Sequence, residues 1–324
     1  MMTSLALPIL AALLLQEPVT DYKGWEQFRL EAAEAKTVAM IIPTIGGRIV
    51  SYSRGENILF DNPDYRGKTL ENTAPDALAQ GYTGYNVDLG PELRRIPRHL
   101  TLWMGKTTAS TIQGGARLVS GHDPAVGMTL IKEVRIDDRT GGLDVIQVMK
   151  NTSERDQAYC LWDRTLCRGG GFAFFPLHPK SARPSGWSAM KDGKYSGTSH
   201  PNVKVLDGIL VAKAEGPPSK LGADSDAGWI AYVRGRQLFV KFFPYFPGGK
   251  YTDGENSVEL YFDPRVCELE PLSPEVSLKP GEEYAFPEKW ILMPLDREVT
   301  SHEEARALVS KIPANPFKKE ESPR

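Results

Sequence analysis

The sequence has few of the residues that mark redox, metal or nucleotide chemistry. Of 324 residues, five are histidine and only three are cysteine, namely Cys160, Cys167 and Cys267. An odd number of cysteines without Cys-x-x-Cys spacing predicts neither a disulfide framework nor a zinc site. No Gly-x-x-x-x-Gly-Lys-Ser/Thr phosphate loop and no Gly-x-Ser-x-Gly turn is present. We therefore expect no metal, no cofactor and no serine nucleophile.

Positive and negative charges are nearly balanced in the sequence. The chain has 39 Lys and Arg residues against 41 Asp and Glu residues, a formal net charge of −2. Nucleic acids and anionic membrane surfaces usually require a concentrated basic face. The densest basic cluster, at residues 94–99, is too short to supply one. We expect no nucleic-acid partner.

Long apolar runs are also scarce, and the clearest is residues 5–15, which carry no charge. A run of this length is shorter than the about 20 residues that span a bilayer, but it fits the apolar part of a secretory signal. We expect residues 1–17 to be a signal peptide and the mature chain to be periplasmic or secreted, with no integral membrane segment after signal removal. The alternative is a buried or frayed N-terminal segment.

The sequence is rich in short segments of period two, bounded by Gly, Pro, Asn and Asp. Along residues 128–136, apolar side chains alternate with Thr129, Glu133 and Arg135, and residues 143–150 form the return strand after a glycine turn. Further strands are expected at residues 27–31, 38–43, 48–53, 100–104, 117–121, 158–166, 172–177, 209–214, 229–233, 237–243, 258–262, 266–269, 275–278 and 290–293.

Helical signals are confined to the C-terminal end. Ser301 and Glu304 form an S-x-x-E capping box, which predicts a short helix. Residues 314–324 are polar and are expected to be a flexible tail. Residues 61–85 and 179–202 are expected to be long loops, and long loops often border a binding site.

So many short strands must avoid exposed edges, either by closing into a barrel or by stacking two large sheets. A propeller would show a repeat of about 40 residues, and none is visible. No linker divides the chain. We therefore expect residues 18–313 to form one all-β domain, a large antiparallel sandwich whose outer face can hold a ligand, with barrel closure as the alternative.

Two carboxylates stand two residues apart in the C-terminal part of the chain. On a strand, Glu268 and Glu270 point to the same face, about 6.5 Å apart. Two acids beside a concave sheet suit general acid/base work on a polar substrate. The alternative is that both face solvent or pair with Arg265 and Lys241.

The surroundings of Glu270 follow a recognisable order. Its strand ends in Glu-Pro, a turn of sequence LKPGE follows at residues 278–282, and a last strand surrounds Trp290. This order resembles the C-terminal end of the galactose mutarotase-like superfamily, which includes aldose 1-epimerases. Residues 46–49 (GGRI) and 151–153 (NTS) are similar to the early strand and the central turn of the same superfamily.

The resemblance implies a β-supersandwich with a sugar-facing groove around Glu270. In the enzymes of the family, a glutamate takes the proton of the anomeric hydroxyl while a histidine protonates the ring oxygen. The family carries this histidine on the strand after the central turn, but residues 159–166 read YCLWDRTL here. His178 or His99 would have to take its place.

Carbohydrate sites combine aromatic faces with hydrogen-bonding groups, because a pyranose has apolar faces and a rim of hydroxyls. Trp187 and Tyr245 are aromatic candidates, although tryptophans in a sandwich are often core residues. The substrate-binding residues expected on this basis are Arg48, Asn86, Glu92, Trp103, Trp162, Asp163, Lys241 and Glu268.

Three functions remain open. The first is an exported carbohydrate-binding protein, favoured by the missing strand histidine. The second is an aldose 1-epimerase or related isomerase, with Glu270 as base and His178 or His99 as acid. A glycoside hydrolase using Glu268 and Glu270 is less well supported, because two acids on one strand lie on the same side of a sugar instead of flanking the bond.

Overall fold

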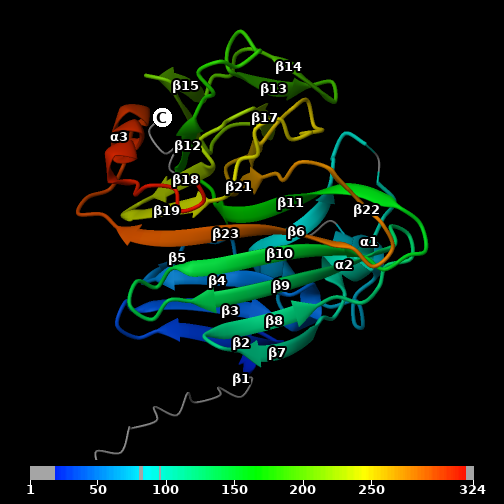
Figure 1. The fold of residues 1–324 in the computed structure, drawn as a ribbon. Coiled ribbons are helices and arrows are strands. Elements are labelled where there is room, and N and C mark those ends of the chain that lie inside the picture. The colour runs from blue at the N-terminus through cyan, green and yellow to red at the C-terminus, as the bar shows by residue number, and fades with distance from the viewer. Residues whose placement is uncertain (1–18, 80–82, 95, 319–324) are drawn as a thin grey trace, which may run out of the picture.

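A computed structural model describes residues 19–79, 83–94 and 96–318, so the expected signal peptide at residues 1–17 lies outside the described residues. Two large antiparallel sheets pack against each other (Figure 1). This confirms the all-β sandwich expected from the period-two segments. No described helix has the length and apolar character needed to cross a membrane.

The larger sheet has thirteen strands within the described part of the chain. Its order is β1-β2-β3-β4-β6-β11-β21-β20-β17-β13-β14, with β5 beside β4 and β22 beside β11. The strands are β1 (Val19–Tyr22), β2 (Trp25–Ala32), β3 (Thr37–Ile42), β4 (Arg48–Arg54), β5 (Glu56–Asn57), β6 (Tyr85–Gly90), β11 (Gln157–Arg168), β13 (Trp187–Lys191), β14 (Lys194–Gly197), β17 (Ser219–Ala223), β20 (Val258–Phe262), β21 (Val266–Pro271) and β22 (Val276–Leu278).

The smaller sheet has ten described strands in the order β15-β16-β12-β18-β19-β23-β10-β9-β8-β7. They are β7 (Thr108–Ile112), β8 (Gly115–Val119), β9 (Met128–Ile136), β10 (Leu143–Asn151), β12 (Phe172–Pro176), β15 (Val203–Leu206), β16 (Ile209–Lys213), β18 (Trp229–Arg234), β19 (Gln237–Phe242) and β23 (Glu283–Pro294). The hairpin of β9 and β10 has the period and the turn expected from residues 128–150.

Alternate residues of both sheets fill the space between them. Trp290 packs edge-on against Tyr85 of the larger sheet and Phe239 of the smaller one, with ring centroids 5.0 and 5.3 Å apart. All three are completely buried. The inner faces are therefore closed, and a ligand can reach only the outer faces or the edges.

Helical segments are short. They are η1 (Pro43–Ile45), η2 (Pro63–Tyr65), α1 (Pro75–Ala79), α2 (Leu100–Met104), α3 (His302–Ala307) and η3 (Leu308–Lys311). The hydroxyl of Ser301 accepts a hydrogen bond from the backbone N–H of Glu304, at 3.1 Å, so the expected N-cap of α3 is present. The Glu304 carboxylate accepts from the backbone N–H of Thr300 at 2.8 Å, one residue before the partner that a capping box uses. Helix α3 packs on the outer face of the smaller sheet (Figure 1).

The start of the expected tail is packed against the domain. The side-chain amide of Asn315 donates to the carbonyl oxygen of Gly228 at 2.9 Å, and Phe317 packs against the apolar cluster under α3. Residues 319–324 lie outside the described part of the chain.

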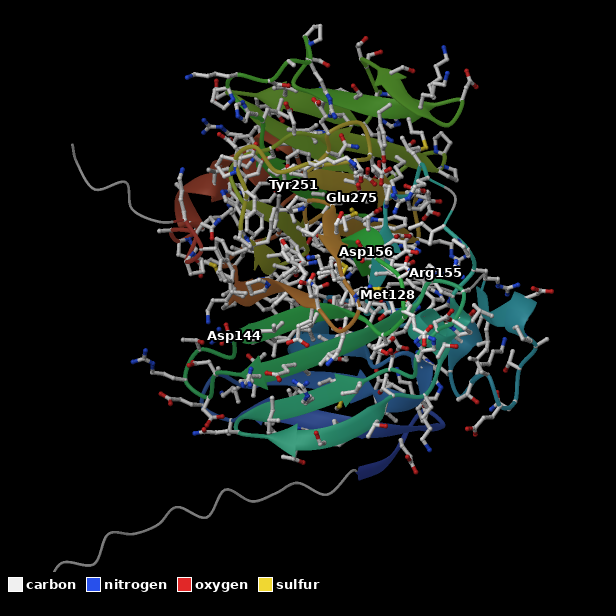
Figure 2. The ribbon with its side chains drawn as sticks, turned by 45° about the vertical axis from the view of Figure 1, so that its right-hand side comes forward. Met128, Asp144, Arg155, Asp156, Tyr251 and Glu275 are labelled. Atoms are coloured by element: carbon white, nitrogen blue, oxygen red, sulfur yellow. The ribbon has the colours of Figure 1, made fainter. Side chains whose placement is uncertain are left out.

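The two turns that carry the family resemblance contact each other. Asn151 ends β10 and donates through its side chain to the carbonyl of Leu278 at 2.8 Å, while Gly281 donates its N–H to the carbonyl of Asn151 at 2.9 Å. Gly281 has φ +84°, which only glycine adopts without strain. Figure 2 shows Arg155 and Asp156 of the β10–β11 connection near Met128. The LKPGE turn moves the chain from β22, which pairs with β11, to β23 of the other sheet.

Residues 100–104 form helix α2 and not the expected strand. The backbone N–H groups of Leu102 and Trp103 donate to the carbonyl of His99 at 3.1 and 3.2 Å. The pattern LTLWM can bury its apolar side chains as a helix or as a strand, so its period alone does not distinguish the two conformations. The expected loops also contain more structure than anticipated, since β13 and β14 form a hairpin within residues 179–202.

Candidate functional site

Strands β11 and β21 lie side by side near the middle of the larger sheet and present charged residues to its outer face. Because side chains alternate along a strand, Trp162 and Arg164 project outward while Asp163 points into the core. On β21, Glu268 and Glu270 project outward and Leu269 is a core residue. The two acids therefore share one face, as their spacing indicates.

These outward side chains form the floor of a pocket of about 260 Å³. We call it the central pocket; its lining residues are Phe60, Glu92, Trp162, Arg164, Lys220, Tyr261, Asp263, Arg265, Val266, Glu268 and Glu270. Of the residues expected to bind substrate, it brings together Glu92, Trp162 and Glu268 around Glu270.

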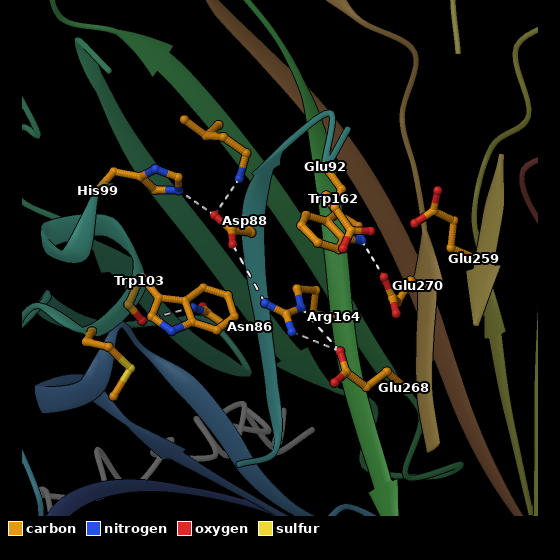
Figure 3. A network of polar contacts seen from close by, with 12 residues as sticks. Asn86, Asp88, Glu92, His99, Trp103, Trp162, Arg164, Glu259, Glu268 and Glu270 are labelled. Carbon is orange, nitrogen blue, oxygen red and sulfur yellow. Dashed lines mark hydrogen bonds and ion pairs between the residues drawn. The ribbon is translucent and has the colours of Figure 1, made fainter. Parts of the chain in front are cut away.

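Glu270 is completely buried by its neighbours at the floor of this pocket. The indole N–H of Trp162 donates to its Oε2 at 2.6 Å (Figure 3), and the ammonium of Lys220 lies 2.9 Å from the same oxygen. The other oxygen, Oε1, has no hydrogen-bond partner among the described residues. A buried carboxylate oxygen without a donor costs free energy, so a ligand hydroxyl would satisfy it once the side chains that cover it move aside.

Lys220 of β17 holds the acids of the pocket together. Its ammonium lies 3.1 Å from a carboxylate oxygen of Glu259 and contacts those of Glu92 and Glu270. Burial disfavours the ammonium, but Glu270 and Glu259 outweigh burial and hold the pKa of Lys220 above its usual range. One lysine thus faces three carboxylates.

Burial and the neighbouring acids together change the protonation of Glu270. Burial raises its pKa to about 8; Lys220 opposes this rise, and Glu268 and Glu259 add to it. Near neutral pH the carboxyl group can therefore donate a proton to a ligand oxygen, and above pH 8 it can only accept. A group of this kind in a pocket marks a functional site.

Arg164 forms one wall of the central pocket. Its guanidinium carbon lies 4.7 Å from the ring centroid of Trp103 and 4.9 Å from that of Trp162. Its Nη2 atom is 3.1 Å from an oxygen of Glu268, and its Nη1 atom is 4.0 Å from Asp88. Figure 3 shows this row from Asp88 to Glu268 across β6, β11 and β21.

The backbone of Trp103 lies against a glycine turn. A Cβ atom on Gly46, which has φ +77°, would lie 2.4 Å from the carbonyl oxygen of Trp103. The GGRI segment therefore lets α2 approach β4 closely, and this approach positions the Trp103 ring beside Arg164.

His99 lies on the far side of Arg164 from Glu270. It helps to line a second hollow of about 260 Å³, which also has Asp88, Trp103 and Arg164 in its walls; we call it the His99 pocket. The imidazole Nε2 is 2.6 Å from an oxygen of Asp88. Burial opposes a charge on the ring, but the hydrogen bond and the charge of Asp88, with the Pro97 carbonyl and the charge of Asp123, together outweigh burial and raise the pKa of His99 to about 9.

The His99–Asp88 pair predicts a specific dependence of stability on pH. Because the pKa of His99 is raised in the folded state, its contribution is complete below the unfolded pKa of about 6.5 and is lost as pH rises through 9. We expect a His99→Gln substitution to destabilise the protein by about 3 kcal/mol more at pH 6 than at pH 9.5, measured by urea unfolding. An equal loss at both pH values would contradict the pairing.

His178 does not lie with Glu270. It follows β12 in the smaller sheet, and its Nε2 is 3.5 Å from a carboxylate oxygen of Asp226. No histidine is among the described residues that line the central pocket. Of the two candidate acids, only His99 lies in an adjoining hollow.

Asp163 and Lys241 lie in the core and not in the pocket. The ammonium of Lys241 contacts Asp163 and lies 3.2 Å from Glu288 of β23, and all three side chains are completely shielded from solvent. Burial and the Glu288 charge raise the pKa of Asp163 well above its usual range. This cluster joins the two sheets and stays out of reach of a ligand.

Arg48 and Asn86 lie beneath Trp103. The guanidinium carbon of Arg48 is 4.4 Å from the Trp103 ring, and the amide of Asn86 donates to the Trp103 carbonyl at 3.0 Å. Both side chains are completely buried. They support the wall of the His99 pocket and are not among the residues that line it.

The sequence did not single out Lys220, which lines the pocket, or Glu259, which Lys220 contacts. Glu259 lies opposite Glu270 in the pairing of β20 with β21. A signal was available, because the period of residues 258–262 puts Glu259 and Tyr261 on one face. Tyr195 also borders the acids: burial, then the charges of Glu259 and Glu270, raise its pKa.

A larger hollow of about 500 Å³ lies elsewhere, against β2 and β7 at the edges of the two sheets. Glu26 and Lys106 are its only charged lining residues among those described. It contains none of the acids that contact Lys220, so volume alone does not identify the site. No group of three or more metal-binding side chains gathers anywhere in the described residues.

Comparison with solved structures supports the fold, whereas comparison by sequence finds no relative. No protein-family profile matches the chain, and no curated protein sequence matches it. The structure is similar to Slr1438 from Synechocystis sp. PCC 6803, with a TM-score of 0.58, 12% identity and coverage of 83% of this chain and 96% of the other. It is also similar to a galactose mutarotase-like protein from Lactobacillus casei, with a TM-score of 0.57, 10% identity and coverage of 82% of this chain and 100% of the other. A third similar structure is a candidate aldose 1-epimerase from Escherichia coli, with a TM-score of 0.56, 11% identity and coverage of 83% of this chain and 99% of the other.

At these identities the comparisons show the fold alone. The galactose mutarotase-like architecture indicated by residues 46–49, 151–153 and 278–282 is confirmed. What the chain binds has to be argued from its own pocket.

Proposed function

We propose that this protein binds a carbohydrate in the central pocket, with Glu270 contacting a sugar hydroxyl. The observation that carries the proposal is the unpartnered Oε1 atom of Glu270, a buried carboxylate oxygen at the floor of an open pocket. Sugar hydroxyls both donate and accept, so they suit a carboxyl group that changes protonation near pH 8.

The remaining polar groups of the pocket fit the same ligand. Arg164 and Lys220 supply donors, Glu92 and Glu268 supply acceptors, and the Trp162 ring lines the pocket with both cations over it, at 4.9 and 4.6 Å from its centroid. Alternation of charged groups with an aromatic ring is what a pyranose requires. The sugar-related proteins that share the fold are consistent with this assignment.

Saturation-transfer NMR against hexoses, uronic acids and oligosaccharides tests the proposal. We expect transfer from the protein to at least one sugar and, at pH 9, weaker transfer to that sugar from a Glu270→Gln variant, which lacks the pocket carboxylate. The absence of transfer to every sugar in the panel would contradict a carbohydrate function.

A second candidate function is the interconversion of anomers. It is favoured by one observation: the raised pKa of His99 keeps the ring charged at neutral pH, beside a pocket that shares Arg164 with the pocket of Glu270. The same NMR spectra follow the exchange between α and β anomers. Exchange faster than in buffer, lost in both Glu270→Gln and His99→Gln variants, would establish this activity; exchange at the buffer rate leaves binding alone.

A further inference from the structure

The central pocket is one of three hollows in a row on the outer face of the larger sheet. On one side lies the His99 pocket, and on the other lies a hollow of about 270 Å³ lined by Ala189, Met190, His200, Pro218, Ser219, Lys220 and Tyr261, which we call the His200 pocket. Each hollow is smaller than the about 300–1,000 Å³ of a typical small-molecule site. Each is therefore suited to a small unit of a larger ligand.

Neighbouring pockets share lining side chains. Arg164 lines both the central pocket and the His99 pocket, and its two terminal nitrogens point to Glu268 in the first and Asp88 in the second. Lys220 and Tyr261 line both the central pocket and the His200 pocket. A guanidinium has donors at several positions, so Arg164 can contact two adjacent units of one ligand.

The row crosses the strands in order. Asp88 in the His99 pocket is on β6 and Ala189 in the His200 pocket is on β13, and β11, β21, β20 and β17 lie between them. Five strand spacings of about 4.8 Å give a length of about 24 Å. A single pyranose is too short to reach from one end of this row to the other.

We propose that the ligand is an oligosaccharide that lies across the strands, with successive units in the His99, central and His200 pockets. The inference rests on the proposed carbohydrate function and specifies its substrate class. Rings and polar groups recur along the row: Trp103 beside His99, Trp162 beside Glu270, and Tyr261 beside His200. This repetition matches the repetition of apolar faces and hydroxyls along a glycan.

Isothermal titration with one to six linked units of the sugar class that binds best is the test. We expect affinity to increase about tenfold or more from the monosaccharide to the trisaccharide, since each added unit gains its own contacts, and to level off beyond the length of the row. A trisaccharide that binds no more tightly than the monosaccharide would overturn the inference and leave the proposed function standing. No binding at any length would remove both.

Two substitutions at exposed positions locate the outer units. Pro97 lines the His99 pocket and Pro218 lines the His200 pocket, and both are exposed, so a tryptophan at either position can fill the hollow without entering the core. We expect Pro97→Trp and Pro218→Trp each to lower trisaccharide affinity about fivefold or more. Pro184→Trp, at an exposed position outside the three pockets, is the control and should change nothing.

Circular dichroism and the melting temperature show whether the tryptophan variants remain folded. If both fold and both bind the trisaccharide as tightly as the wild type, the outer pockets hold no sugar and the inference is wrong. If only one lowers the affinity, the ligand occupies two pockets and the three-pocket assignment is wrong.

Discussion

At pH 9, where Glu270 is ionised, a Glu270→Gln variant is expected to bind sugar about 10- to 100-fold more weakly than the wild type, because hydrogen bonds to a charged group contribute about 1.5–3 kcal/mol. The same variant is expected to be more stable than the wild type at alkaline pH. Glu270 has a raised folded-state pKa of about 8, so its contribution to stability is lost as pH rises from about 4.5 through 8. Glutamine does not titrate and avoids this loss.

The opposite signs of the two effects distinguish a binding residue from a structural one. Urea unfolding at pH 5 and pH 9 should show the variant gaining about 4 kcal/mol on the wild type over this interval. Glu283→Gln, at an exposed position on β23, is the matched control and should leave both affinity and stability unchanged. A Glu270 variant that is destabilised at both pH values and still binds sugar would show that Glu270 serves the fold.

The second large effect concerns the core cluster of Lys241. Replacing Lys241 by methionine leaves Asp163 and Glu288 buried without their cation, and breaking a buried ion pair in this way costs about 3–5 kcal/mol. We expect a loss of this size in the free energy of unfolding. Sugar affinity of the folded protein should not change, because the cluster faces the space between the sheets.

A double variant, Lys241→Met with Asp163→Asn, checks the cause. Removing one of the two buried carboxyl groups together with Lys241 should recover part of the lost stability. A loss below about 1 kcal/mol in the single variant would show that the ion pair is not needed for stability. A weaker sugar affinity with unchanged stability would show that Lys241 and Asp163 contribute to sugar binding.

Local patterns in the sequence predicted the parts of the site that depend on a single strand. The two-residue spacing puts Glu268 and Glu270 on one face, and the adjacency of Asp163 and Arg164 puts these two on opposite faces. The period alone does not say which face is the outer one. Both sides of β11 carry buried apolar neighbours. Asp163 was therefore expected to bind substrate, whereas Arg164 is the residue that lines the pocket.

Contacts between distant strands were not available from the sequence. Lys220 reaches Glu270 because β17 pairs with β20 and β20 with β21, an order that only the assembled sheet fixes. Residues 100–104 became a helix because the chain packs LTLWM against the turn at Gly46, where tertiary contact overrides a pattern that fits a strand equally well. The family resemblance predicted the architecture. It also predicted a groove around Glu270, but it did not predict which histidine would lie nearest to that groove.

The most direct test of the account is a crystal structure of the complex with the sugar that binds best. The account predicts a pyranose ring in the central pocket, with a hydroxyl oxygen about 2.6–3.0 Å from Oε1 of Glu270. A sugar bound elsewhere, for example in the hollow between β2 and β7, with Oε1 of Glu270 still lacking a partner, would contradict it.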